Sequence, residues 1–113
     1  ILHVLINCGF IETEQNIVCI DMIRLFCKQN NYSFGSVLSI GSGEAILDTP
    51  FKFLVKRKIK ALTRSIECKK PDSLSVSMPL SKKAFLSAST KFWINYGKKN
   101  GITKEQMDTM EYE

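Results

Sequence analysis

The sequence is poor in several residues that mark special classes of protein. It has one histidine, four cysteines without a C-x-x-C pair, three prolines and six glycines in 113 residues. A zinc site of the usual spacing is therefore not expected, and collagen-like, low-complexity and disordered chains are excluded. No apolar run approaches the roughly 20 residues that span a bilayer, and the apolar start lacks the basic flank of a signal peptide. We expect no membrane partner and a cytoplasmic location.

The chain does have a globular composition and a moderate excess of positive charge. It is 44% hydrophobic and 24% charged, with a net charge of +5, and its length suits one domain with a single core. Eight basic residues and one acidic residue lie between Lys52 and Lys70. Such a run can bind phosphates or nucleic acid, but no aromatic platform is interleaved with it. A solvated helix face is the favoured interpretation, so a nucleic-acid partner is not expected.

The first third of the chain has the pattern of a strand, a helix and a second strand. Ile1 to Ile6 form a continuous apolar run, which predicts a central or nearly central strand of a parallel sheet. Thr13 can cap the helix that follows, and Asn30 and Asn31 suit its left-handed end. Phe34 to Ile40 form a second apolar run. Because a βαβ crossover is right-handed, the two strands are predicted to be parallel, and the fold class is α/β.

The helix between these strands is predicted to bury one face. Its polar stripe consists of Asp21, Arg24 and Lys28. Its inward-facing residues are predicted to be Ile17, Ile20, Ile23, Phe26 and Cys27. Cys19 and Cys27 are expected to be buried free thiols that act as small hydrophobes, which fits a reducing compartment.

The next segment predicts a helix that lies on the sheet. Asp48 or Thr49 can act as its N-cap, and Pro50 suits the first helical position. Apolar residues then recur along one face: Phe51, Val55, Ile59, Leu62 and Ile66. Residues 68–79, which contain two prolines, predict a loop or a short extended link.

The last third of the chain predicts two helices. The first covers residues 80–100 and ends at Gly101 in the C′ position. It carries an apolar stripe that is expected to pack in the core or against a partner: Leu80, Ala84, Phe85, Ala88, Phe92, Trp93 and Tyr96. Thr103 and Gln106 then form a capping-box pattern, which predicts a short last helix through about Met110.

Two small polar turns follow the predicted strands. One is Asn7 to Glu12 and the other is Gly41 to Glu44. Ligands of parallel sheets gather beyond the carboxyl ends of the strands, so these turns are the site candidates. Gly9, Gly41 and Gly43 permit close backbone approach or a positive φ, and exposed N–H groups in such turns suit anionic or carbonyl ligand atoms. Helix-entry turns also use glycine for structural reasons alone.

Three stretches resemble flavodoxin-like proteins of the NAD(P)H-dependent FMN reductase family. They are INCGFIETEQN, the subsequent CIDMIRLFCKQNNYSFGSVLSIGSGEAI, and the later FWINYGKKNGIT. In that family a strand ends in a similar Asn-Cys-Gly-Phe turn, the next strand ends in a glycine-rich turn plus Glu, and a terminal helix carries a Trp before an Asn-Gly turn. The similarity covers nearly all of the chain and is lowest in the basic helix and beyond it.

The resemblance implies a flavodoxin-like three-layer α/β/α fold with parallel strands in the order 2-1-3-4-5 and FMN at the strand ends. Residues 1–6 and 34–40 would be the fourth and fifth strands. The family's flavin-contacting turn corresponds here to Asn7, Cys8, Gly9, Phe10 and Glu12. The neighbouring turn corresponds to Gly41, Ser42, Gly43 and Glu44.

The family's first three strands and its Ser/Thr-rich phosphate loop have no counterpart in this sequence. The resemblance therefore implies a single partial domain over residues 1–113, truncated to the last two parallel strands with their helices, in which residues 80–113 are a C-terminal helical extension. The chain is expected to begin in mid-domain, as a truncated gene product, a proteolytic remnant or a deliberately shortened chain would. Without the phosphate loop we expect it to bind FMN poorly or not at all.

Two classes of function follow from the sequence. The first is the C-terminal portion of an FMN-dependent NAD(P)H oxidoreductase, in which the cofactor carries out the electron transfer. Cys8 would then be structural or contact the flavin edge, since His3 lies on the same strand and forms no evident thiol–imidazole pair. The second is a non-enzymatic interaction module whose basic helix binds an acidic partner or nucleic acid. A blander interpretation is that the chain has no activity of its own.

An open sheet edge also predicts a partner. Two parallel strands cannot form a well-covered sheet, and the first would expose an edge. We therefore expect a homo-oligomer or pairing with a separately supplied N-terminal half.

Overall fold

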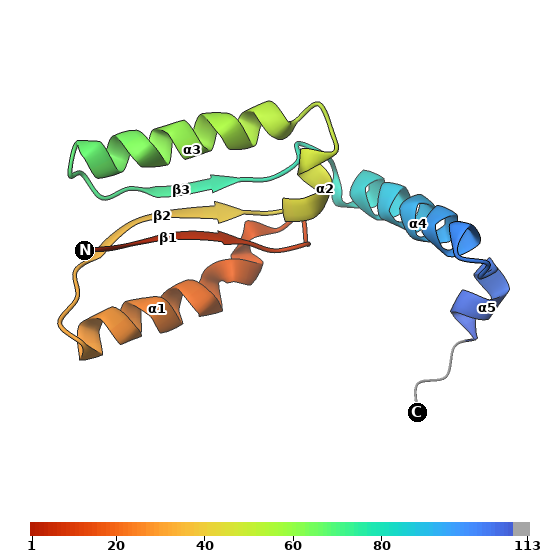
Figure 1. Cartoon of the computed structure of the whole chain (residues 1–113), viewed down its shortest axis with the longest axis horizontal. Coiled ribbons are helices and arrows are strands. Elements are labelled where there is room, and N and C mark those ends of the chain that lie inside the picture. Colours follow the sequence, from red (N-terminus) through yellow and green to blue (C-terminus); the bar gives the residue numbers. More distant parts are fainter. Residues whose placement is uncertain (110–113) are drawn as a thin grey trace. The chain divides into compact units, whose positions relative to one another are not determined.

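The chain forms two compact units, Ile1–Pro79 and Leu80–Glu113, in a computed structural model that describes residues 1–109 (Figure 1). The first unit contains a parallel sheet in the order β1-β2-β3. Its elements are β1 (Leu2–Asn7), the 3-10 helix η1 (Thr13–Asn16), α1 (Ile17–Gln29), β2 (Phe34–Ile40), α2 (Gly43–Leu47), α3 (Lys52–Glu67) and β3 (Ser73–Val76). The second unit contains α4 (Lys82–Lys99) and α5 (Lys104–Asp108).

The predicted α/β class and the parallel pairing of the first two strands are confirmed. β1 pairs with β2 in parallel register, with Val4 beside Val37 and Asn7 beside Ile40. Helices α1 and α3 cover opposite faces of this sheet (Figure 1). Ile20 of α1 packs against Val4 and Val37, whereas the hydroxyl of Ser65 in α3 contacts that of Ser36. Neighbouring residues of a strand point to opposite faces, which places the two helices on the two sides.

The number of strands is a correction to the sequence-based expectation. Residues 68–79 were predicted to form a loop or an extended link, and the last two parallel strands were expected to make up the sheet. Instead, β3 pairs in parallel with β2 from Val37 beside Ser73 to Ile40 beside Val76. This strand has only four residues, two of them serine, so its own propensity is low. It forms because the second edge of β2 offers a row of backbone hydrogen-bonding groups.

The position of β1 in the sheet is a second correction. Its continuous apolar run predicted a central or nearly central strand, but β1 lies at an edge of the three-stranded sheet and β2 lies at its centre. Of the six residues of β1 only Val4 is buried, whereas every residue of β2 after Phe34 is buried. Leu5 remains 52% exposed. The apolar run predicted that both faces of β1 would be buried. The described residues cover only the face on which Val4 packs against α1.

Helix α1 buries fewer residues than its sequence pattern predicts. Ile20 and Cys27 are buried and Ile23 is half-buried, but Ile17 and Phe26 are exposed. Cys19 is exposed as well, so the prediction of a buried thiol holds for Cys27 and is wrong for Cys19. The helix has apolar residues almost all around it. A single sheet can cover only one of its faces.

The start of α1 also differs from the prediction. Thr13 does not cap an α-helix, because residues 13–16 form a 3-10 turn and α1 begins only at Ile17. The carbonyl oxygen of Thr13 accepts a hydrogen bond from Ser39 Oγ at 3.2 Å. That bond ties the turn to β2. At the other end, Asn31 has φ of 57°, which confirms the predicted left-handed terminus.

Helix α3 begins slightly later than predicted. Its N-cap is Phe51 rather than Asp48 or Thr49, because Thr49 is used in the preceding turn. The Thr49 hydroxyl donates to the Ile46 carbonyl at 2.8 Å and accepts from the Phe51 N–H at 3.2 Å. Val55 and Leu62 of the predicted apolar stripe are buried, whereas the side chains of Ile59 and Ile66 are exposed.

The second unit confirms the predicted end of its first helix and start of its second. Gly101 follows α4 with φ of 74°. The helix was predicted to begin at Leu80, but α4 begins at Lys82, because Ser81 caps it by accepting from the Ala84 N–H at 3.2 Å. Thr103 and Gln106 form the predicted capping box of α5. α5 ends at Asp108, and the predicted end at Met110 lies outside the described residues. The aromatic stripe of α4 is not part of a core in the described residues, since Phe92, Trp93 and Tyr96 are all exposed.

Candidate functional site

The two predicted turns meet at the carboxyl ends of β1 and β2. The N–H of Cys8 donates to the carbonyl oxygen of Ile40 at 3.0 Å, and the N–H of Gly43 donates to the carbonyl oxygen of Cys8 at 2.8 Å. The N–H of Ser42 donates to the carbonyl oxygen of Phe10 at 2.6 Å. Parallel pairing brings both strand ends to one edge of the sheet, and these bonds then join the two turns into one surface.

A third segment, which the sequence did not predict, joins this surface. The N–H of Gly41 donates to the carbonyl oxygen of Val76 at 2.8 Å, at the end of β3. The Ser77 hydroxyl donates to the carbonyl oxygen of Ile11 at 2.6 Å and lies 3.0 Å from the Ser42 hydroxyl. The sequence offers one indication that Ser77 belongs to this surface, which is its place after a short alternating run. Because that run was predicted to be a loop or an extended link, Ser77 could not be assigned to the end of a strand.

The glycines of the two turns have different roles. A Cβ atom on Gly41 would lie 2.7 Å from the carbonyl oxygen of Ile11, and one on Gly43 would lie 2.9 Å from Cβ of Asn7. Both glycines therefore permit close backbone approach, as predicted. Gly9 has no atom within 4 Å of such a Cβ and no positive φ, so neither predicted reason applies to it. The positive φ falls on Ser42, at 56°, which is buried between the turns.

Four of the nine residues predicted for the site use their backbone N–H groups within the protein. Those of Cys8, Gly41, Ser42 and Gly43 each donate to a backbone carbonyl. The remaining part of the first turn is its tip, where Gly9 and Phe10 are exposed and Phe10 is 62% exposed. Ligand binding at this surface therefore has to use the tip and the exposed side chains of Asn7 and Glu44.

Cys8 and His3 do not form a catalytic pair. The thiol of Cys8 donates to the carbonyl oxygens of Phe10 at 3.6 Å and Glu12 at 3.5 Å, which holds the turn in shape. Nδ1 of His3 accepts a hydrogen bond from the backbone N–H of Ser36 at 2.9 Å. Because Ser36 lies near the start of β2, the imidazole is engaged at the opposite end of the strands.

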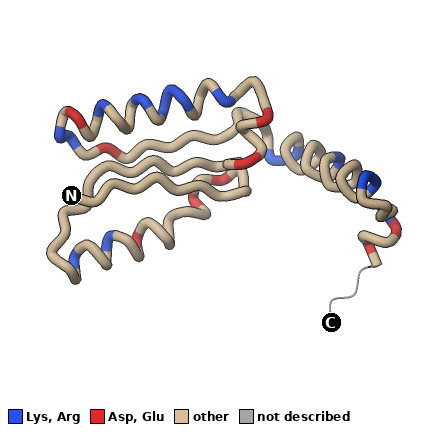
Figure 2. Tube along the Cα trace, viewed as in Figure 1, with Lys and Arg blue, Asp and Glu red and all other residues tan. Residues whose placement is uncertain are grey.

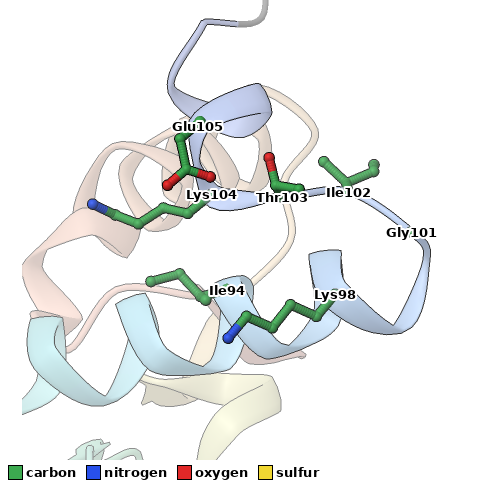
Figure 3. A pocket seen from close by; sticks show the side chains of 7 residues that line it. All are labelled: Ile94, Lys98, Gly101, Ile102, Thr103, Lys104 and Glu105. Atoms are coloured by element: carbon green, nitrogen blue, oxygen red, sulfur yellow. The ribbon is translucent and has the colours of Figure 1, made fainter.

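Two hollows of the surface lie away from these turns. The larger one, of about 590 Å³, is formed by α4 and α5, with Lys98 from α4 and Lys104 and Glu105 from the start of α5 (Figure 3). Hydrogen bonds from the Glu105 backbone N–H and the Thr103 hydroxyl, and the charges of Lys104 and Lys98, lower the pKa of Glu105. This carboxylate is fully exposed.

The smaller hollow, of about 280 Å³, lies at the amino ends of the strands. It is lined by Arg24, Phe34, Gly35, Val37, Pro71, Asp72 and Ser73. None of the nine residues predicted from the sequence lines either hollow. The candidate surface is therefore the exposed rim of the strand ends rather than one of these hollows.

Within residues 1–109, no three His, Cys, Asp or Glu side chains are grouped so that they could hold a metal ion. No helix in the part of the chain that the structure describes is long and apolar enough to cross a membrane. Comparison with family models, curated proteins and solved structures found no match for this chain. The functional argument therefore depends on the geometry of the strand ends and on the resemblance of the motifs.

Proposed function

We propose that this chain contributes one edge of the flavin site of an FMN-dependent NAD(P)H oxidoreductase. The observation that supports the proposal is the contact between the two turns, in which Gly43 donates to the Cys8 carbonyl at 2.8 Å. The residues that resemble the family's flavin-contacting turn and its neighbour thus lie at one edge of a parallel sheet. That edge is where ligands of open parallel sheets bind.

The residues of this edge fit the flavin ring better than the flavin phosphate. The exposed Phe10 side chain and the adjacent Gly9 backbone offer an apolar surface and an open approach to a planar ring. Asn7 can donate to and accept from the polar edge of the ring. By contrast, none of the nine residues of the two turns carries a positive charge, and Glu12 and Glu44 are acidic. A phosphate would have to be held by groups outside these turns.

The residues of the two turns would therefore contact the flavin ring and not its phosphate. When bound, the flavin supplies the hydride or electron transfer. The hydrogen bonds of Cys8, Ser42 and Gly43 hold the two turns in a fixed position, so the exposed tip is presented to the ring without further ordering. Such preorganisation lowers the entropy that binding has to overcome. No side chain of the turns has to act as an acid, a base or a nucleophile.

The proposal is tested by comparing FMN with riboflavin, which has the same ring and no phosphate. We expect both ligands to bind the isolated chain equally and weakly, with dissociation constants above about 10 µM, because only ring contacts contribute. In ¹⁵N NMR titrations the shifts should concentrate on the amides of Gly9 and Phe10 and on those of Gly43 and Glu44. Lumichrome, the bare ring system, should give the same pattern.

Two results would contradict the proposal. One is the absence of shifts in these turns at millimolar riboflavin. The other is binding of FMN that riboflavin does not share, with shifts on the lysine-rich α3, because that pattern would reflect phosphate attraction to a basic helix. The variant Phe10→Ala should weaken riboflavin binding, and Phe53→Ala, an equally exposed aromatic side chain on α3, should leave it unchanged.

One feature favours a second candidate function, a non-enzymatic interaction module. Lys and Arg side chains follow one another along α3, and its one acidic residue is Glu67 at the end (Figure 2). These basic side chains are mostly exposed, so they can meet an acidic partner. Binding of duplex DNA or RNA whose affinity falls steeply between 50 and 200 mM salt would support this candidate. Binding of nucleic acid through the two turns alone would not support it.

A further inference from the structure

We propose that the open edge of β1 and the adjoining flank of α1 form a two-fold interface between two copies of this chain. The surface consists of the outward backbone of β1 and, on the α1 side of the sheet, the side chains of Cys19, Met22, Phe26 and Tyr32, and is called the β1–α1 edge. The side chain of Leu5 lies on the other face of β1, because Val4 points toward α1. The proposal concerns assembly and does not depend on the flavin.

Within residues 1–109, β2 is the only strand that pairs with β1, so the other side of the β1 backbone is open. The N–H groups of Leu2 and Cys8 donate toward the β2 side, to Ser33 at 2.8 Å and Ile40 at 3.0 Å. Because backbone groups alternate along a strand, the N–H and C=O of His3, Leu5 and Asn7 face away from β2. Strands at natural sheet edges usually carry lysine, proline or an inward-pointing charge that prevents pairing. β1 carries none of these, since its sequence is LHVLIN.

Helix α1 turns an apolar flank toward this open edge. Its charged flank lies on the other side, because the Arg24 guanidinium sits 4.9 Å from the ring centroid of Phe34 and lines a hollow with Asp72 near β3. Positions 19, 22 and 26 lie on the opposite flank by helical spacing. Met22 is 66% exposed, and the ring of Phe26 stacks on that of Tyr32 at 6.0 Å. An apolar flank beside an open strand edge indicates that something covers both.

The charge distribution favours a second copy as the occupant. The chain has a net charge of +5. Helices α3 and α4 carry most of its lysines (Figure 2), and nearly all of these side chains are exposed. Two copies that met through those helices would repel each other. The side chains of the β1–α1 edge include no Lys, Arg, Asp or Glu. The edge is therefore the face through which two copies of a basic chain can approach.

The geometry of the sheet fits a two-fold contact. If β1 pairs antiparallel with β1 of the second copy, Leu5 faces Leu5 of that copy across the axis, and the outward groups of His3 and Asn7 bond reciprocally. Ile20 packs on Val4 and on Val37, so α1 lies over both β1 and β2. With strands about 4.8 Å apart, the two α1 helices would then lie about 10 Å apart, which is a normal distance for packed helices.

The size of the contact is sufficient for a weak, specific dimer. Phe26 and Tyr32 are each about half exposed and so offer roughly 100 Å² apiece. With Leu5, Met22 and the strand backbone, the buried area over two copies is on the order of 1,000 Å², where specific interfaces begin. We expect a dimer with a dissociation constant in the range of about 1 to 100 µM.

Sedimentation equilibrium of the whole chain, together with two surface variants, tests the interface. Leu5→Pro removes an outward N–H without removing a bond to β2, which proline tolerates at an edge, and Met22→Glu places a charge in the apolar flank. Both should shift the dimer to monomer by at least tenfold in dissociation constant. Thr63→Glu adds the same charge on exposed α3 and should leave the dimer intact. Circular dichroism and NMR spectra would establish that each variant is folded.

A cross-link tests the register independently. In a chain with the exposed Cys19 and Cys68 replaced by serine, Leu5→Cys should form an intermolecular disulfide on mild oxidation, because paired residues of antiparallel strands are about 5.5 Å apart. Ser75→Cys, exposed on β3 at the other sheet edge, should not. A wild-type chain that is monomeric at about 200 µM would overturn the proposal. So would a dimer that resists Met22→Glu or cross-links at position 75 instead.

Discussion

The side-chain amide of Asn16 donates to the hydroxyl oxygen of Ser39 at 3.0 Å and to the carbonyl oxygen of Ile40 at 3.3 Å. Asn16 and Ser39 are both buried. Their contact joins the 3-10 helix η1, which follows β1, to the end of β2. It therefore fixes the segment that follows the first turn against the strand that precedes the second. The same strand end carries the proposed flavin edge.

Loss of this contact should weaken the fold. Asn16→Ala leaves the Ile40 carbonyl with one partner fewer in a buried position, which costs about 1 to 3 kcal/mol of unfolding free energy. Asn30→Ala, which also removes an amide that donates to a carbonyl, lies at an exposed helix end and should cost less than about 1 kcal/mol. Urea unfolding followed by circular dichroism measures both. Equal losses would show that burial of the Asn16 amide is unimportant.

Two glycines of the candidate surface should respond differently to a methyl group. Gly41→Ala places Cβ 2.7 Å from one backbone oxygen and 2.8 Å from the Ser77 hydroxyl oxygen, so we expect a loss of about 1 to 3 kcal/mol from overpacking. Gly9→Ala meets nothing within 4 Å and has no positive φ. It should change the unfolding free energy by less than about 0.5 kcal/mol. A destabilised Gly9→Ala would contradict the conformation of the first turn.

The serine pair that links β3 to the turns should be coupled. The hydroxyls of Ser42 and Ser77 are 3.0 Å apart, and Ser77 also donates to Ile11. We expect Ser42→Ala and Ser77→Ala to cost about 1 kcal/mol each and the double variant to cost measurably less than their sum. A double-mutant cycle by thermal unfolding determines the coupling. Strict additivity would mean that the two hydroxyls do not interact.

The carboxylate of Glu105 should titrate below its ordinary range. Its pKa is lowered by a hydrogen bond from its own backbone N–H, by the Thr103 hydroxyl, and by Lys104 and Lys98. A lowered pKa means that the contribution to folding is present above the unfolded-state pKa and is lost as the pH falls through the folded-state pKa. NMR titration of the Glu105 side-chain carboxyl carbon measures this directly.

A variant pair assigns the cause of that pKa. Thr103→Ala removes a hydrogen-bond donor to Glu105 and half of the capping box, so the pKa of Glu105 should rise toward its ordinary value and α5 should fray. Thr90→Ala removes a hydroxyl that bonds only within α4, and the pKa of Glu105 should not change. An unaltered pKa in Thr103→Ala would leave the backbone bond and the lysines as the cause.

Much of the secondary structure could be predicted because its signals act within a few residues. The left-handed Asn31, the C′ glycine at Gly101 and the capping box of Thr103 each depend on neighbours in the chain. The juxtaposition of the two glycine-containing turns was also predictable. It follows from the parallel pairing of two strands joined by one helix, and the N–H of Gly43 indeed reaches the Cys8 carbonyl.

Three features of the candidate surface could not be predicted in this way. Ser77 joins it only because β3 pairs with β2, and the alternating run of β3 is only four residues long, two of them serine, so it is a weak strand signal. The positive φ falls on Ser42 and not on the glycines beside it, and Ser42 is held by Phe10 and Ser77, which lie more than thirty residues away in the chain. The N–H groups of the turns are used by carbonyls that lie more than thirty residues away, such as Phe10 for Ser42.

The amino-acid sequence by itself determined the α/β class, the ends of α1 and α4, the start of α5, and the place of the two polar turns after two parallel strands, because periodicity, caps and βαβ handedness are local properties. Only the tertiary structure decided that β1 is an edge, that a serine-rich segment is the third strand, and that the apolar flank of α1 faces an open side. Strand neighbours and the covering of a helix flank depend on groups far apart in the chain. Their selection requires the backbone hydrogen bonds and apolar contacts of the whole sheet.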